Sequence, residues 1–213
     1  TGLGTVTMAG DNSFFTGEVE VTVLNGTLVA ETVLRPRSFV IGSSGHLKGT
    51  ANTLVGDITS HGTLTITEDN DATYGGSLSG NGGGLFIKDG DGILRLTGVN
   101  NFAGRTDIRE GALQGNTQSL TGSMITMLEE TALIFSQSGN GTFAGDILGF
   151  GTLHKAGSGE LHLTGSNNYT GGTIIHQGGL RGDTDSLHGN IDTGLSASNN
   201  LIFDQDSNGT FAG

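Results

Sequence analysis

The chain has 213 residues, a formal net charge of −12, 40 glycines, one proline and no cysteine or tryptophan. Its nine Lys and Arg residues are scattered, which excludes the basic footprint of a nucleic-acid-binding protein or of a protein that binds an anionic membrane surface. The lack of cysteine excludes a disulfide scaffold, and no apolar run reaches the roughly 18 residues of a transmembrane helix. With 33% hydrophobic residues, a turn-dense all-β chain fits better than a compact globule.

Residues 1–60 follow the pattern of the later chain only in part, and we expect degenerate coils there. Within them, residues 30–50 break the spacing and carry the only proline of the chain. Insertions in repeat proteins tend to leave as loops on one face, and that face often binds. A protruding loop would make Arg35, Pro36, Arg37 and His46 a candidate binding site; the alternative is an irregular extra coil.

From residue 61 onward, short runs alternate between apolar and polar residues. Residues 63–67 (TLTIT) alternate, as do the surroundings of Leu94 and Leu96 and of Leu161 and Leu163. Period-2 runs bounded by glycine and asparagine predict half-buried strands. No 3.6-residue pattern persists, so we expect no helix.

A long repeat decides the architecture. Residues 88–98 (KDGDGILRLTG) match residues 155–165 (KAGSGELHLTG), an offset of 67, and the residues downstream stay in phase. A β-sandwich has no reason to repeat its strands in this way, whereas stacked coils do. If three coils make one repeat, each coil has about 22 residues, and parallel strands stack about 4.8 Å apart. Residues 61–213 are then regular repeats within a single β-helix.

The run at 145–173 closely resembles the passenger-associated repeat of autotransporters, and residues 88–120 are a second match. The resemblance implies a right-handed parallel β-helix, here of roughly nine or ten coils over residues 1–213. It also implies export to the surface of a Gram-negative cell, and a C-terminal outer-membrane β-barrel outside this segment. We therefore expect the sequence to be a piece of a longer passenger.

Candidate chemical sites are weak, and we predict no catalytic residue, metal site or cofactor. His162 and His176 stand where the other repeat has arginine, as expected of outward-facing polar positions. The run at 89–92 (DGDG) has calcium-like spacing, but its counterpart at 156–159 (AGSG) has no carboxylate, which favours a turn. Residues 42–46 (GSSGH) imitate a nucleophile motif without an identifiable acid partner.

Two functions fit these observations. The first is a non-catalytic adhesive rod that binds a host-surface or matrix ligand, or the same protein on neighbouring cells, so that many weak contacts add up. The alternative is a structural stalk that supports an N-terminal enzymatic domain such as a subtilisin-like protease. The Asp, His and Ser motifs of such a hydrolase would lie upstream of this segment.

Overall fold

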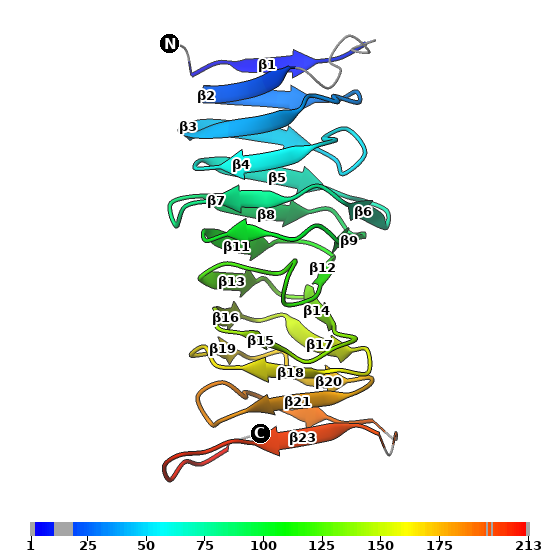
Figure 1. Cartoon of the computed structure of the whole chain (residues 1–213), viewed down its shortest axis with the longest axis vertical. Coiled ribbons are helices and arrows are strands. Elements are labelled where there is room, and N and C mark those ends of the chain that lie inside the picture. The colour runs from blue at the N-terminus through cyan, green and yellow to red at the C-terminus, as the bar shows by residue number, and fades with distance from the viewer. Residues whose placement is uncertain (1–2, 11–18, 195, 197, 212–213) are drawn as a thin grey trace.

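The computed structural model describes residues 3–10, 19–194, 196 and 198–211. Over these residues it has 23 strands and no helix, and the strands stack along one long axis with the two termini at opposite ends (Figure 1). Neighbouring strands pair in parallel, as between β8 (Leu85–Asp89) and β11 (Arg105–Ile108). The predicted parallel β-helix is confirmed, with about nine turns.

Each coil visits three faces in the same order. Face 1 holds β4 (Asp57–Ser60), β7 (Leu78–Gly80), β10 (Asn101–Phe102), β15 (Gly141–Phe143), β18 (Glu160–Leu163), β21 (Gly179–Gly182) and β23 (Asn200–Phe203). Face 2 holds β1 (Thr5–Met8), β5 (Thr63–Thr67), β8, β11, β13 (Met124–Met127), β16 (Asp146–Gly149) and β19 (Asn168–Tyr169). Face 3 holds β6 (Ala72–Tyr74), β9 (Ile93–Leu96), β12 (Ala112–Gly115), β14 (Ala132–Ser136), β17 (Thr152–Ala156), β20 (Thr173–Ile175) and β22 (Ile191–Asp192). The long strands β2 (Glu20–Ala30) and β3 (Ser38–Gly49) run from face 1 onto face 2.

The coil is shorter than the sequence predicted. On face 3, Leu113 pairs with Leu133 and Leu133 with Leu153, a step of 20 residues per coil. The expectation of three 22-residue coils per repeat was therefore wrong, because 67 residues make about three and one-third coils of this length. Each repeat restarts one face further on: β8 lies on face 2 and its equivalent β17 on face 3, while β9 lies on face 3 and its equivalent β18 on face 1.

Alternation along the strands fills the interior with apolar side chains. Leu94, Leu113, Leu133 and Leu153 form one stacked row of fully buried residues. Each coil supplies few apolar residues, but stacking buries them continuously along the rod. This explains how a chain with so few hydrophobic residues builds a core.

Two buried lysines close equivalent turns. Lys88 Nζ donates hydrogen bonds to the carbonyl oxygens of Asp89, Gly90 and Glu110, at 2.8, 2.5 and 3.2 Å. Lys155 Nζ, 67 residues later, bonds to the carbonyls of Ala156, Gly157 and Gln177, at 2.9, 2.7 and 3.0 Å. Both side chains are fully buried. A buried ammonium group requires such acceptors, so each lysine fixes a turn and ties it to the next coil.

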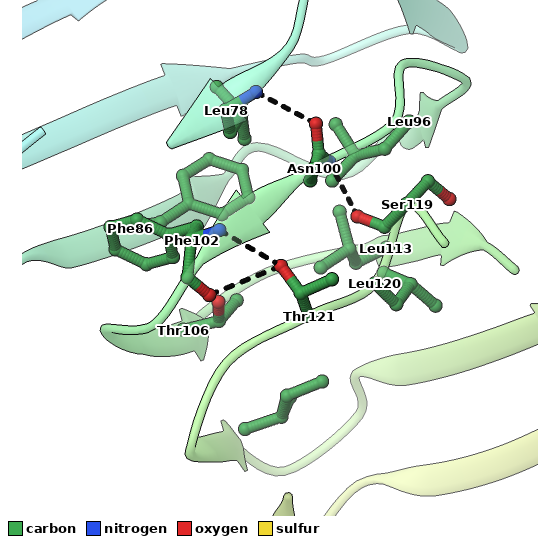
Figure 2. A pocket seen from close by; sticks show the side chains of 11 residues that line it. Leu78, Phe86, Leu96, Asn100, Phe102, Thr106, Leu113, Ser119, Leu120 and Thr121 are labelled. Atoms are coloured by element: carbon green, nitrogen blue, oxygen red, sulfur yellow. Dashed lines mark hydrogen bonds between the residues drawn. The ribbon is translucent and has the colours of Figure 1, made fainter. Parts of the chain in front are cut away.

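Two buried asparagines join three consecutive coils. Asn100 Oδ1 accepts from the Leu78 amide at 2.7 Å, and its Nδ2 donates to the Ser119 carbonyl at 2.5 Å (Figure 2). Asn167, the equivalent residue, bonds in the same way to Ile147 and Ser186. Each side chain thus satisfies backbone groups on the coil before it and the coil after it.

The segment at 30–50 is mostly strand. β3 takes up residues 38–49 and pairs with β2 on one side and with β4 and β5 on the other. The loop that the sequence allowed at 30–50 is therefore confined to residues 31–37. Leu34 is buried there and forms an isolated bridge with Leu54, which ties this short connection to the next coil.

Candidate binding surfaces

The interior near Asn100 and Phe102 has no room for a substrate. The cavity drawn in Figure 2 measures about 10 Å³, lies among side chains such as Leu78, Phe86 and Leu113, and admits no more than one water molecule. Binding in this part of the rod must therefore use side chains that point outward from the three faces.

The candidate site predicted from sequence is spread over the coil. Arg35 and Arg37 are exposed and Pro36 is buried, in the connection before β3. His46 lies further on, in the part of β3 that belongs to face 2, and its Nε2 is 2.8 Å from Thr65 Oγ1. Burial and then the charge of Lys48 lower the pKa of His46. The structure thus places His46 and the two arginines on different parts of the surface, and a binding role for them stays a prediction.

Charges of both signs mix on faces 1 and 2. On face 2, Arg105 Nε lies 2.5 Å from Asp107 Oδ1. On face 1, Arg181 pairs with Asp204 at 2.5 Å and lies 3.9 Å from Glu160. These exposed pairs contribute little to stability, but they give both faces a charged character.

Face 3 differs from the other two. One outward row runs along it in register, and we call it the face-3 row: Arg95, Gln114, Ile134, His154, Ile174 and Asp192. Beside it, β12, β14 and β17 present Ala112, Ala132 and Thr152 as a second row. The middle of this face therefore carries no carboxylate in a chain of net charge −12.

Two histidines meet on face 3. His154 Nδ1 lies 2.9 Å from His176 Nε2, with the rings 18° from parallel and their centroids 5.2 Å apart. One ring nitrogen must carry hydrogen and the other must be free for this bond to form. Burial, and then the charge of His176, lower the pKa of His154, which favours its neutral form. The sequence analysis treated His176 alone and missed the pair, because only the 20-residue coil brings position 176 beside 154.

The other chemical motifs have partners within the chain. At the calcium-like turn, the carbonyl oxygens of Asp89 and Gly90 accept the Lys88 ammonium. Ser43 and Ser44 are exposed, whereas the neighbouring His46 bonds to Thr65. Over the described part of the chain, no three His, Cys, Asp or Glu side chains come together in a way that would hold a metal ion.

Comparison with known proteins agrees with the geometry. The chain is 32% identical over 188 residues to the adhesin BmaC autotransporter of Brucella suis biovar 1 (strain 1330). The match covers 79% of this chain and 5% of that protein. The model of the passenger-associated-transport-repeat family matches residues 1–30, 86–114 and 153–181, of which the last two begin 67 residues apart. The chain belongs to the autotransporter passengers with this repeat.

An autotransporter passenger of this kind is exposed on, or secreted from, the outer membrane of a Gram-negative cell. The family match at residues 1–30 includes the N-terminal stretch whose coils the sequence analysis described as degenerate. No helix within the described residues is long and apolar enough to cross a membrane. No solved structure matches the chain.

Proposed function

We propose that this passenger segment is a non-catalytic adhesive rod. It acts in adhesion to a host-surface or matrix ligand, or in self-association between cells that leads to aggregation and biofilm. The observation that carries the proposal is the regular display of outward side chains from every coil, around an interior filled by residues such as Leu113, Leu133 and Leu153. Weak contacts that recur along a rod and between many copies add up to strong attachment.

The match to a relative named an adhesin supports this proposal. Because this segment matches only 5% of that relative, the activity of the whole protein is itself part of the proposal, as is a C-terminal outer-membrane β-barrel that anchors it. In the competing function, the coils are a stalk that holds an enzymatic domain away from the cell.

Surface display of the full-length protein tests the proposal. A non-adherent Gram-negative strain carries either the parent protein or a variant that lacks this segment, with surface density matched by an epitope tag. We expect the variant to lose cell settling in suspension, binding to matrix-coated wells, or both. If it reaches the surface and adheres as well as the parent, the segment is a stalk.

A further inference from the structure

We propose that face 3 is the surface through which two copies of this chain pair, antiparallel and face to face. The inference rests on the proposed function, because it specifies the partner and the contact for self-association. It follows from the distribution of charge along one row of side chains.

A second copy of this chain is difficult to approach over most of its surface. Each copy carries a formal net charge of −12, so two rods repel each other unless they meet where carboxylates are absent. The outward side chains of β12, β14 and β17 offer such a place, with Gln114, Ile134 and His154 at its centre. Ile134 and Ile174 are half-buried and leave part of their apolar surface in contact with solvent.

The ends of the face-3 row carry opposite charges. Arg95 stands on β9 at one end and Asp192 near the other, on β22, with four uncharged side chains between them when the histidine is neutral. Asp192 is exposed, and Arg95 is partly exposed although it also contacts Asp71 at 3.0 Å. The row therefore reads positive, neutral, negative along the rod.

Such a row is complementary to itself under a two-fold axis. The strands β9, β12, β14, β17, β20 and β22 are consecutive neighbours, so an axis between β14 and β17 sets β9 of one copy against β22 of the other. Arg95 of each copy then faces Asp192 of its partner, and Ile134 faces His154. A two-fold contact of this kind uses the same patch on both subunits and closes without forming a fibre.

The contact is small. Six strands spaced about 4.8 Å apart, each presenting a short outward face, give on the order of 300–400 Å² per copy. A stable interface buries about 800 Å² per partner, so an isolated pair of segments binds weakly. Copies crowded on two opposed cell surfaces reach effective concentrations in the millimolar range, at which weak pairing suffices.

Charge reversal in separate copies tests the pairing. Arg95→Asp makes both ends of the row negative, and Asp192→Arg makes both ends positive. Sedimentation equilibrium of the 213-residue chain, up to about 1 mM, should show pairing for the parent and at least about tenfold weaker pairing for either variant alone. An equimolar mixture of the two variants should pair to within about threefold of the parent, because both rims become complementary again.

Two further variants address the face itself. Ile134→Glu places a carboxylate at the centre and should abolish pairing, whereas Ile202→Glu, at an outward half-exposed position on face 1, should leave it unchanged. Circular dichroism and a thermal melt check that each variant is folded, since Arg95→Asp also removes the contact to Asp71.

The outcomes separate the inference from the proposed function. A parent chain that stays monomeric at about 1 mM overturns the pairing, as does a mixture that pairs no better than either variant alone. A mixture that pairs more tightly than the parent indicates a parallel arrangement and also contradicts the proposal. In each of these cases, adhesion lost by the displayed protein that lacks the segment still supports an adhesive rod with another surface or ligand.

Discussion

Lys88 and Lys155 make the same three kinds of hydrogen bond at equivalent positions of successive repeats, yet they lie at different corners of the rod. Lys88 ends β8 on face 2, and Lys155 lies in β17 on face 3. The local sequence builds the same turn in both places, while the one-third coil left over from each repeat turns the second copy onto the next face. A surface feature that recurs with the repeat is consequently displayed in more than one direction around the axis.

Removal of a buried ammonium should loosen its turn. Lys155→Met deprives three carbonyl oxygens of a charged donor, and we expect the free energy of unfolding to fall by about 1–3 kcal/mol. Urea titration followed by circular dichroism measures the change. Lys48→Met removes an exposed lysine from face 2 and serves as the control, with an expected change within about 0.5 kcal/mol. Equal effects of the two substitutions would contradict a structural role for the buried group.

The same lysine should make stability depend on alkaline pH. Burial lowers the pKa of Lys155 to about 8, although its three carbonyl acceptors favour the charged form and oppose that shift. An unfolded lysine has a pKa near 10.4, so between these values the unfolded chain holds more protons than the folded chain. Stability should therefore rise from pH 8 to 9.5. The rise should be smaller in Lys155→Met, and an unchanged slope in that variant would be evidence against the shift.

Asn100 should be far more important than its neighbour. Asn100→Ala leaves the Leu78 amide and the Ser119 carbonyl without their side-chain partner inside the rod, and we expect a loss of about 2–4 kcal/mol. Asn101→Ala changes an exposed asparagine one residue along the chain and should cost less than about 0.5 kcal/mol. Urea midpoints that shift equally in both variants would show that the bridge between coils contributes nothing.

Glu130 is held in a conformation that suits another residue. Among the described residues, it is the non-glycine residue with a positive φ, at 62°. Asparagine tolerates this region better, so Glu130→Asn should raise the free energy of unfolding by about 0.5–1 kcal/mol. Glu129→Asn makes the same change of charge next door at a position without positive φ, and thus separates backbone strain from electrostatics. A gain of the same size at both positions would assign the effect to charge alone.

Acid should weaken the rod at the histidine pair. The lowered pKa of His154 means that the unfolded chain, with a pKa near 6.5, takes up a proton before the folded chain does. Stability from this group is therefore present above pH 6.5 and is lost as the pH falls through 6.5 towards the folded-state pKa. If both rings become protonated, the bond between Nδ1 and Nε2 cannot form, because each nitrogen then carries hydrogen.

A comparison of urea midpoints at pH 7.5 and 5.5 measures this effect. His154→Gln removes the titrating group while keeping a polar side chain on face 3. Its midpoint should fall less between the two pH values than that of the parent chain, and identical falls would exclude His154 as the source. Since the carboxylates titrate in both proteins, the difference between the two chains is the informative quantity.

The sequence by itself determined the all-β class, the 67-residue repeat and the membership in the passenger family. Alternation at positions such as Leu94 and Leu96, and the recurrence of the turn at Lys88 as that at Lys155, are local signals that survive without coordinates.

Only the tertiary structure decided the length of the coil, and with it which residues become neighbours. Coil length depends on how tightly each of three corners turns, and the repeat does not report it, because 67 residues are not a whole number of coils. The row from Arg95 to Asp192, the contact between His154 and His176, and the place of β3 in residues 30–50 all follow from the 20-residue step between stacked strands. A difference of two residues per coil, accumulated over several coils, brings entirely different side chains together on the surface.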